Sequence, residues 1–378
     1  MTGLSIGINA LYLIPGRVGG TEIYLRSLLG AIAEIDSVNQ YVVFTNRETD
    51  QDLVPRQANF LAAPQPVRAS FRPFRILWEQ TGLVPAARRR RLDVLFNPGF
   101  TSPILAPCPT VTVFHDLQHK RCPQYFRKLD LPFWRFFLWA SARRSTMLLT
   151  GSEATAQDLA RYYRLRPEKI RVIEYGVDPR FFDIRRRRQG ITPQPYLLCV
   201  STLHEHKNLD RLVRAFAQFR LARPDYRLVL AGMRGFHARA LDELVAELGL
   251  TEAVWLTGWI PREDLYGLFL HASAFLYPSS FEGFGLPVLE ALAAGLPTAC
   301  ASIEPLTQMA GPAALQFNPQ DQGAILDAMT RLTSDHALRE RLAEAGPARA
   351  AEFSWRSTAR KTLEALQDAA GHRSRSSS

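Results

Sequence analysis

The residues with the clearest chemical potential lie in the stretch Tyr277-Pro-Ser-Ser-Phe-Glu-Gly-Phe-Gly-Leu-Pro-Val-Leu-Glu290. A predicted strand ends near Tyr277. Gly283 and Gly285 permit tight turns after it, and Pro287 suits the first turn of a helix. A loop that runs into a helix in this way presents unpaired backbone N–H groups and the positive end of the helix dipole. The stretch therefore predicts a site for an anion.

Two carboxylates flank this predicted site, Glu282 on the loop and Glu290 about one turn into the helix. At about 100° per residue, they lie well apart around one helix axis and do not share a face. Glu290 can accept two hydrogen bonds from vicinal hydroxyls. The alternative is an acid at a helix start plus a solvated acid, because this spacing also arises by chance. The glycines, the proline and the strand-to-helix context favour the functional interpretation.

A second candidate for anion binding is Lys207, in Cys199-Val-Ser-Thr-Leu-His-Glu-His-Lys-Asn208. This stretch again runs from a predicted strand through a loop into a helix, for which Asn208 is a good N-cap. The ammonium of Lys207 can lie near the helix start and bind a phosphate there as a point charge. The alternative is a solvated surface lysine. Only five lysines occur in the chain, which favours a specific role for this one.

His115 and Asp116 follow the predicted strand that starts at Val111. His115 could donate to a sugar hydroxyl or to a developing negative charge, with Asp116 fixing the orientation of the ring. A structural histidine is the alternative. Gly19 and Gly20 precede a predicted helix and could admit a phosphate or a sugar, although their loop lacks the G-x-G-x-x-G pattern of dinucleotide sites. A simple hinge in the loop explains these glycines equally well.

These candidates need elements that bring distant loops together. Short apolar runs alternate with segments of helical periodicity, a pattern that indicates βαβ units around parallel sheets. The 378 residues suffice for about two domains, and 47% hydrophobic with 22% charged residues excludes a collagen, a coiled coil and a wholly disordered chain. Strands are predicted at residues 4–9, 41–45, 94–97, 111–115, 147–150, 170–174, 196–200, 227–231, 254–258, 274–277 and 298–301.

We therefore predict an α/β fold with two Rossmann-like domains, whose parallel sheets face each other across a cleft. Ligands of such sheets bind at the carboxyl ends of the strands. The predicted domains span residues 1–182 and 196–354, separated by a charged linker at 183–195 that is closed by glycine and prolines. A helix at 355–370 is expected to pack back toward the first domain, and a polar tail at 371–378 has nothing to bury.

Positive charge and aromatic residues gather in two stretches of the first domain, Arg68 to Arg91 and Lys120 to Arg144. The net charge of +10 is nearly all arginine and favours polyanions, phosphorylated ligands or an anionic lipid surface. A basic, aromatic, amphipathic stretch can lie on such a membrane face. The alternative is domain core plus solvated arginines, since aromatics at helical spacing are usually buried.

The four cysteines form no C-x-x-C pair, so we expect reduced thiols and no zinc site. The first residues, 1–9, lack the basic start and apolar run of a signal peptide, and no run of about 20 apolar residues occurs. These features predict a cytoplasmic protein, either free or at the inner face of the membrane.

Taken together, the residues resemble the retaining glycosyltransferases of family four, which have the GT-B fold, and within them a bacterial mannosyltransferase-like branch. The block Phe281-Glu-Gly-Phe-Gly-Leu-Pro-Val-Leu-Glu is the specific part of this resemblance. Weaker matches are Gly19-Gly-Thr-Glu-Ile-Tyr, Leu77-Trp-Glu-Gln, Asp93-Val-Leu-Phe-Asn-Pro, Val113-Phe-His-Asp, His206-Lys-Asn-Leu and Leu256-Thr-Gly-Trp.

The resemblance implies a nucleotide-sugar donor, GDP-mannose or a UDP-sugar, in the second domain and an acceptor in the first. Implied site residues are Lys207 with the amides of Gly283, Phe284, Gly285 and Leu286 for the diphosphate, Glu290 for the ribose, Glu282 for the donor sugar, His115 at the reacting centre, and Trp259 and Ile260 near the base. Ser201 and Thr202 stand where many relatives have an arginine. The resemblance further implies no metal, no other cofactor, and a glycan or polyprenyl-linked acceptor in cell-surface polysaccharide synthesis.

Three other functions are alternatives to a glycosyltransferase. A nicotinamide-dependent oxidoreductase requires a glycine fingerprint followed by an acid about 20 residues on. A nucleic-acid-binding protein has some support from the arginine runs, but no such module is recognised, so no nucleic-acid partner is expected. A relative that binds nucleotide sugars without transferring them is the third alternative.

Overall fold

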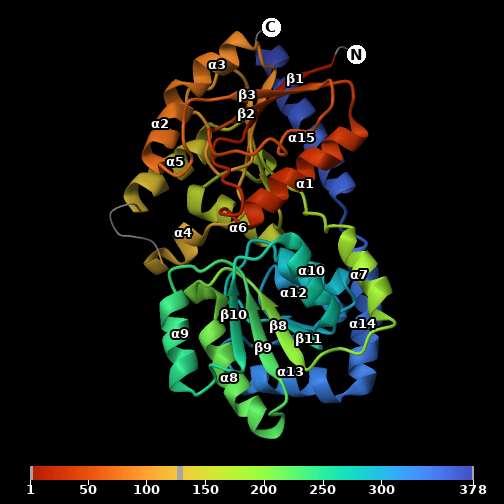
Figure 1. Ribbon diagram of the computed structural model, residues 1–378. Helices are drawn as coiled ribbons and strands as arrows, with labels where there is room; N and C mark the ends of the chain where they lie inside the picture. Colours follow the sequence, from red (N-terminus) through yellow and green to blue (C-terminus); the bar gives the residue numbers. More distant parts are fainter. Residues whose placement is uncertain (1–2, 126–130, 377–378) are drawn as a thin grey trace. The chain divides into compact units, whose positions relative to one another are not determined.

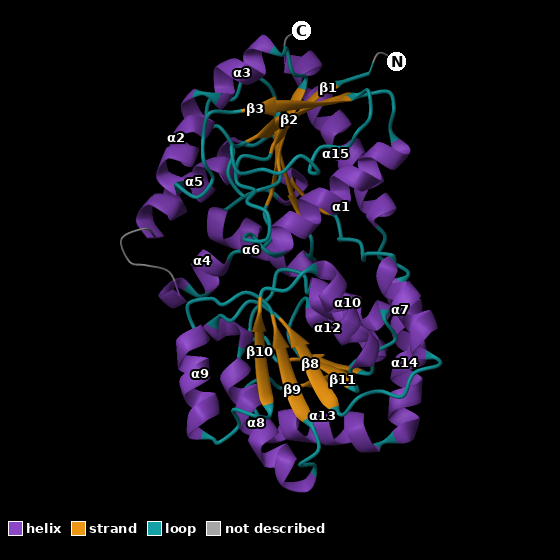
Figure 2. Cartoon of the chain, viewed as in Figure 1, coloured by secondary structure: helices purple, strands orange, loops and turns teal. Residues whose placement is uncertain are grey.

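The computed structural model describes residues 3–125 and 131–376, which form two compact α/β units (Figure 1). The first unit comprises Met1–Gly176 together with Trp355–Ser378, and the second comprises Val177–Ser354. Each unit is built around one parallel sheet with helices packed around it (Figure 2). The predicted fold class, two Rossmann-like parallel sheets, is thereby confirmed.

The sheet of the first unit has seven strands in the order β3-β2-β1-β4-β5-β6-β7. Its strands are β1 (Ser5–Asn9), β2 (Gln40–Thr45), β3 (Phe60–Pro64), β4 (Val94–Asn97), β5 (Thr110–Val113), β6 (Met147–Thr150) and β7 (Ile170–Val172). Its helices are α1 (Gly20–Ile35), α2 (Arg72–Thr81), α3 (Leu83–Arg89), α4 (Gln118–Arg121), α5 (Leu131–Arg144), α6 (Glu153–Tyr163) and α15 (Trp355–Ser376). Helix α15 packs against α1.

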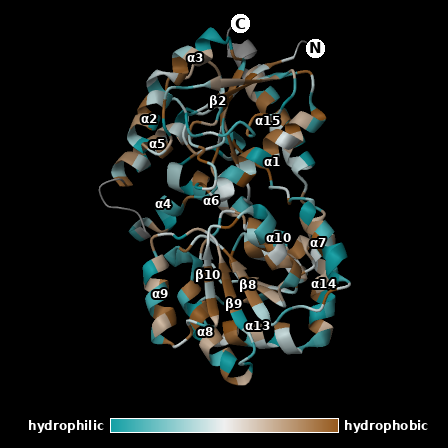
Figure 3. Cartoon of the chain, in the orientation of Figure 1, coloured by the Kyte–Doolittle hydropathy of each residue, from teal (hydrophilic) through white to brown (hydrophobic). Residues whose placement is uncertain are grey.

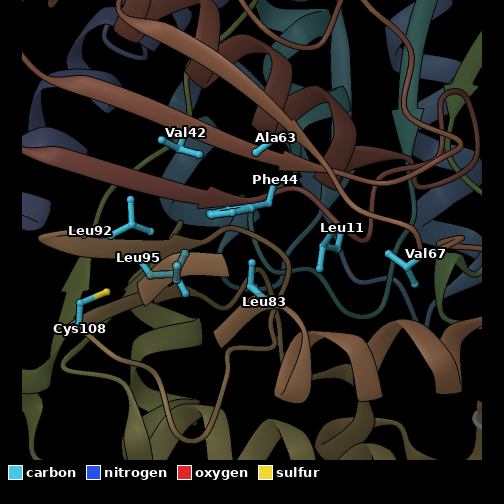
Figure 4. Close-up of a cluster of buried hydrophobic side chains, with 10 residues drawn as sticks. Leu11, Val42, Phe44, Ala63, Val67, Leu83, Leu92, Leu95 and Cys108 are labelled. Carbon is cyan, nitrogen blue, oxygen red and sulfur yellow. The ribbon is translucent and has the colours of Figure 1, made fainter. Parts of the chain in front are cut away.

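The strands of the first unit are nearly continuous apolar runs because a parallel sheet covered by helices is buried on both faces. One core cluster gathers side chains from β2, β3, β4 and the adjoining loops and helices (Figure 4). Its members are Leu11, Val42, Phe44, Ala63, Val67, Leu83, Ala87, Leu92, Leu95 and Cys108.

The sheet of the second unit has six strands in the order β10-β9-β8-β11-β12-β13. Its strands are β8 (Tyr196–Val200), β9 (Arg227–Ala231), β10 (Val254–Gly258), β11 (Ala274–Tyr277), β12 (Thr298–Ala301) and β13 (Leu315–Phe317). Its helices are α7 (Arg180–Arg188), α8 (Leu209–Ala222), α9 (Ala238–Glu247), α10 (Arg262–His271), α11 (Leu286–Ala293), α12 (Leu306–Ala310), α13 (Gln322–Ser334) and α14 (His336–Ala350). Strands β8 and β9 are apolar, whereas α8 and α13 carry both apolar and polar residues (Figure 3).

The strand order of each sheet reverses at one point, between β1 and β4 in the first unit and between β8 and β11 in the second. At such a switch point the loops that follow the two strands diverge, and ligands of α/β sheets bind there. The loop that carries Lys207 follows β8, and the loop that carries Glu282 follows β11. The topology of the second unit therefore brings the two predicted anion-binding loops together.

The structure differs from the sequence-based expectations at several places. Strands β3 and β13 are additional strands at the two sheet edges, where they are partly exposed; β3 ends in Pro64 and β13 has only three residues. The predicted linker at 183–195 is partly helical, because Phe181 and Ile184 of α7 are buried. Helix α15 continues to Ser376, beyond the predicted start of the polar tail.

The arginine run of α7 has a structural role that the charge pattern did not reveal. The guanidinium of Arg188 donates to the carbonyls of Phe269, Leu270 and Ala272 at 2.7 to 3.0 Å. It thereby satisfies carbonyl groups at the end of α10 that have no partner inside the helix.

The boundary between the two units also differs from the predicted one. The first unit ends at Gly176 and not at residue 182.

None of the described helices has the length and apolar composition that a membrane span requires. The predicted basic and aromatic stretch from Lys120 to Arg144 is described in part. Its residues Phe126, Arg127, Lys128 and Asp130 lie outside the described residues.

Candidate nucleotide-sugar site

Lys207 lies in the connection from β8 to α8. The chain leaves β8, forms a short 3-10 turn at Glu205–Lys207, and enters α8 after Asn208. Asn208 occupies the N-cap position as expected, but its backbone is left-handed at φ 56° and its side chain makes no capping hydrogen bond. The prediction of a side-chain cap is therefore wrong.

The side chain of Asn208 instead holds neighbouring loops in place. Its Nδ2 donates to the carbonyl of Pro278 at 3.1 Å and to that of Pro319 at 2.7 Å. The carbonyl of His206 accepts from the backbone N–H of Ser280 at 2.8 Å and from its hydroxyl at 2.9 Å. These bonds tie the loop after β8 to the loop after β11.

The tied loops bring Lys207 and Glu282 into direct contact. Lys207 Nζ lies 2.6 Å from Glu282 Oε1 and donates to the hydroxyl of Tyr277 at 3.2 Å. The side chains of Lys207 and Glu282 are 14% and 9% exposed, so the ion pair is mostly shielded from water.

Helix α11 begins directly after this ion pair. Its N-cap, Gly285, has φ 106°, and a Cβ there would lie 2.3 Å from Leu306 Cδ2, so only glycine fits this turn. Pro287 lies in the first turn, as predicted. The amide of Leu286 is at the first helical position and has no acceptor within the helix. Phe284 is buried and packs edge-on against Phe353. The chain thus runs from β11 through a glycine-containing loop into α11 as expected, and the binding of an anion there stays a prediction.

Glu290 is buried in α11 and is held by an arginine that the sequence analysis did not select. Arg262 Nη2 donates to Glu290 Oε1 at 2.7 Å and lies 3.6 Å from Asp178 Oδ2. Burial raises the pKa of Glu290, and Arg262 acts against this shift. A carboxylate in this position can remain an acceptor of hydroxyl hydrogen bonds when a cation compensates its charge.

The remaining candidates of the second unit lie at the carboxyl ends of β8 and β10. Ser201 is buried and its amide donates to the carbonyl of Ala231 at 2.9 Å, while the carbonyl of Thr202 accepts from His204. Neither brings a positive charge beside Lys207. Trp259 is 59% exposed, and Ile260 beside it is partly buried. Both follow β10 in the sequence and are therefore at the edge where ligands bind.

His115 lies in the first unit, and both of its ring nitrogens make hydrogen bonds. Its Nε2 is 2.8 Å from the carbonyl of Pro98, and its Nδ1 is 2.8 Å from the hydroxyl of Tyr175. A carbonyl can only accept, so Nε2 carries the proton and Nδ1 accepts from the tyrosine. Burial lowers the pKa of His115 to about 4, so the ring is neutral near pH 7. The rings of Tyr24 and Phe100 pack edge-on against it.

The expected partnership between His115 and Asp116 is absent, because both ring nitrogens bond elsewhere. Asp116 Oδ1 accepts from the amide of Gln118 at 2.9 Å instead. Gly19 has φ 61° at the N-cap of α1, and the position of a Cβ on Gly20 is open. A side chain at Gly20 meets no atom within 4 Å, so this glycine is not required by packing.

The structure thus groups Lys207, Glu282, Glu290 and the start of α11 in the second unit, and places His115, Asp116, Gly19 and Gly20 in the first. Arg262 could have been suspected because it follows β10 at the ligand-binding edge. The contact of Asp178 with it had no sequence signal. Among the residues described, no group of three or more His, Cys, Asp or Glu side chains could hold a metal ion.

Comparison with known proteins supplies independent information. The family model described as "Glycosyl transferases group 1" matches residues 181–349, and that described as "Glycosyltransferase Family 4" matches residues 18–181. The O-antigen chain mannosyltransferase B of Escherichia coli is 31% identical over 269 residues, which cover 68% of this chain and 70% of that protein. The MMP alpha-(1->4)-mannosyltransferase of Mycolicibacterium hassiacum is 29% identical over 410 residues, covering 95% and 97%.

Among solved structures, HepE (Alr3699) of Anabaena in complex with UDP and glucose has a similar fold. It aligns with a TM-score of 0.75 at 20% identity, over 96% of this chain and 99% of that one. This likeness concerns the arrangement of the two parallel sheets and their helices.

Proposed function

The chain belongs to glycosyltransferase family 4, has the GT-B fold and is similar to bacterial mannosyltransferases, and from this premise we propose that it transfers a hexose, by preference mannose, from a nucleoside diphosphate sugar to a glycan or lipid-linked acceptor. We further propose that the transfer retains the anomeric configuration, needs no metal ion or other cofactor, and serves the synthesis of a cell-surface polysaccharide.

The observation that carries this proposal is the shielded pair of Lys207 and Glu282 beside the start of α11. Departure of the nucleotide develops negative charge on the diphosphate. An ammonium and backbone amides aimed at that charge can contribute several kcal/mol to the transition state. We propose that Lys207 and the amide of Leu286 supply them.

Donor binding is proposed to exchange the partners of this ion pair. The diphosphate takes the ammonium of Lys207, and Glu282 is then available to accept hydrogen bonds from hydroxyls of the donor sugar. Glu290 accepts from the ribose hydroxyls, and Trp259 with Ile260 lies near the base. Glu282 orients the sugar and favours the positive charge that develops on its ring, and the acceptor attacks from the face that the diphosphate leaves.

His115 is proposed to act as a neutral hydrogen-bond donor and not as an acid or base. Its Nε2–H now bonds to the carbonyl of Pro98. Contact with a sugar hydroxyl at the reacting centre therefore requires exchange of this bond. Gly19, Gly20 and Asp116 are proposed to line the approach of the acceptor or a phosphate, and Ser201 with Thr202 to adjoin the donor.

Support for mannose comes from the names of the relatives, both of which are mannosyltransferases. The base is a separate question, because HepE was solved with UDP and glucose. GDP-mannose and UDP-sugars are therefore both candidate donors.

A membrane-facing surface is also proposed for the first unit, consistent with an enzyme at the cytoplasmic face of a membrane that uses a polyprenyl-linked acceptor. Six large apolar side chains on and beside α2 and α5 are 41% to 63% exposed: Phe71, Phe74, Leu77, Phe133, Phe136 and Trp139. The guanidinium of Arg72 lies 4.2 Å from the ring centroid of Trp134, which places α2 beside α5. Arg143 and Arg144 in the last turn of α5 add positive charge that favours anionic lipid.

The membrane proposal is tested by flotation with vesicles of phosphatidylcholine containing phosphatidylglycerol. The double variant Phe136→Ser and Trp139→Ser is expected to lose binding. Phe236→Ser removes an aromatic side chain that is 82% exposed in the second unit and serves as the matched control. Equal binding by all three proteins would contradict the proposal.

The enzymatic proposal is tested by screening nucleoside diphosphate sugars for thermal stabilisation and slow donor hydrolysis, which needs no knowledge of the acceptor. We expect one donor to raise the melting temperature of the protein and to be hydrolysed slowly. A chelator should change neither result. Stabilisation without hydrolysis or transfer would indicate the non-catalytic relative. Once an acceptor is found, the anomeric configuration of the product tests retention.

A further inference from the structure

Each of the two carboxylates that flank the start of α11 has its own cation among the described residues. Lys207 pairs with Glu282, and Arg262 pairs with Glu290. Lys207 has a long, flexible side chain, whose ammonium donates to Glu282 and to the hydroxyl of Tyr277. The proposed binding of diphosphate draws this ammonium away from Glu282. The question is then whether Arg262 can move in the same way.

Arg262 is held from several sides. Its Nε donates to the hydroxyl of Tyr266 at 3.1 Å, and its Nη2 donates to Glu290 and approaches Asp178. The guanidinium also lies 5.2 Å from the ring centroid of Phe181 and 5.4 Å from that of Tyr266. Movement toward a phosphate would break these contacts together. Arg262 is therefore a fixed cation that stays with Glu290.

Glu290 needs such a cation to bind hydroxyls. Its side chain is 5% exposed, and burial disfavours the ionised form. Arg262 of α10 opposes this effect, whereas Asp178 adds to it. Among the described residues, Tyr277 of β11 and Tyr266 of α10 also face this cluster, and Arg180 pairs with Asp178. The diphosphate of a donor would add further negative charge nearby and so favour protonation of Glu290.

We propose that Arg262 is a positioning residue for ribose recognition, whose fixed guanidinium keeps Glu290 anionic and oriented to accept both ribose hydroxyls while Lys207 turns to the diphosphate. This inference rests on the proposed function, because it takes Glu290 as the group that binds the ribose. Arg262 acts through Glu290 and does not touch the nucleotide. A carboxylate has about four acceptor positions on two oxygens, so its bond to Arg262 at Oε1 leaves capacity for two hydroxyls.

The test compares ribonucleotides with 2′-deoxyribonucleotides. GDP, UDP and their 2′-deoxy counterparts are titrated calorimetrically into the wild-type protein and the variants Arg262→Met and Arg262→Lys between pH 5 and pH 8. The matched control is Arg180→Met, because Arg180 also pairs with Asp178, at 3.0 Å, but makes no contact with Glu290.

The wild-type protein is expected to prefer the ribonucleotide about tenfold or more, the range for a hydrogen bond to a charged group. Arg262→Met loses most of this preference while deoxynucleotide affinity changes little. Loss of the cation raises the pKa of Glu290. As the pH is lowered, the residual preference of Arg262→Met for the ribonucleotide is therefore lost at a higher pH than the preference of the wild type. Arg262→Lys retains the charge and restores much of the preference, and Arg180→Met behaves as the wild type.

Two results would overturn the inference. An unchanged preference and pH profile in Arg262→Met shows that Glu290 does not depend on Arg262. Equal weakening of ribonucleotide and deoxynucleotide shows a phosphate contact or a general structural role. If the wild-type protein binds neither GDP nor UDP, the proposed function fails, which is a distinct result. If Arg262→Met does not fold, Arg262→Gln, which keeps an amide donor without the charge, replaces it in the same titrations.

Discussion

Replacement of Lys207 by methionine separates the structural from the catalytic contribution of the ion pair. Methionine keeps much of the length of the side chain but removes the ammonium that lies 2.6 Å from Glu282 Oε1. In the absence of a donor, the change leaves a carboxylate that is 9% exposed without its cation. In the presence of a donor, it removes the charge proposed to stabilise the departing diphosphate.

The two contributions have different expected magnitudes. Loss of one preorganised donor to a developing anion costs about 2.7 to 4 kcal/mol, so kcat for donor hydrolysis should fall about 100- to 1000-fold. Breaking one side of a buried ion pair costs up to about 3 to 5 kcal/mol of stability. The exposed edge of Glu282 places the expected loss toward the lower part of that range, so the variant should fold with a reduced melting temperature.

A double variant distinguishes the two contributions. Lys207→Met combined with Glu282→Gln removes both charges, so the free energy of unfolding should recover, because no unpaired carboxylate remains. Turnover should not recover, because the diphosphate still lacks its cation. Lys361→Met, at an exposed position of α15, is the matched lysine control. Activity of Lys207→Met or of the double variant near that of the wild type would show that the ammonium of Lys207 does not stabilise the departing diphosphate.

Three further predictions concern stability. Gly285→Ala should destabilise the protein by roughly 1 to 3 kcal/mol in denaturant titrations, because alanine is strained at φ 106°; Gly20→Ala, at an open position, should change little, and equal effects would contradict this. Burial lowers the pKa of His115 to about 4. Between about pH 6.5 and pH 4 the unfolded chain therefore binds a proton that the folded protein does not, and the free energy of unfolding should fall by about 3 kcal/mol as the pH is lowered through this range. His115→Gln should lessen this acid loss and His336→Gln, at an exposed position, should not. Arg262→Met should cost about 3 to 5 kcal/mol because it leaves Glu290 buried and unpaired, and an unchanged melting temperature would refute this.

Much of the fold follows from local sequence patterns. Central parallel strands such as β8 and β9 are buried on both faces, so an apolar run identifies each of them, at residues 196–200 in β8 and 228–231 in β9. Strands β3 and β13 are at sheet edges and partly exposed; β3 is apolar but ends in Pro64, and β13 has only three residues, so neither shows the pattern of a buried central strand. Helix α7 was not predicted because its two buried residues, Phe181 and Ile184, are followed directly by a run of four arginines that is typical of a solvated linker.

The loop motifs of the site were recognisable because they depend on local backbone geometry. Gly285 and Pro287 indicate the start of α11 from their own conformational preferences. The contact of Lys207 with Glu282 depends on hydrogen bonds between loops that are distant in sequence, made by Asn208 and Ser280. Such pairings follow from tertiary structure and have no local signal.

The same limit applies to the partners of the titratable groups. The choice of Arg262 as partner of Glu290 depends on how α10 packs, and the bond of His115 to Tyr175 joins residues sixty positions apart. A histidine followed by an aspartate suggested a local pair, but the tertiary contacts were stronger determinants of its orientation.

The central claim is that the diphosphate of a nucleotide sugar binds between Lys207 and the start of α11. A crystal structure of the protein with GDP or UDP tests it most directly. We expect the β-phosphate within hydrogen-bonding distance of Lys207 Nζ and the amide of Leu286, with Glu282 released from the ammonium. A nucleotide bound elsewhere, with the ion pair of Lys207 and Glu282 intact, would show that this site does not bind the diphosphate.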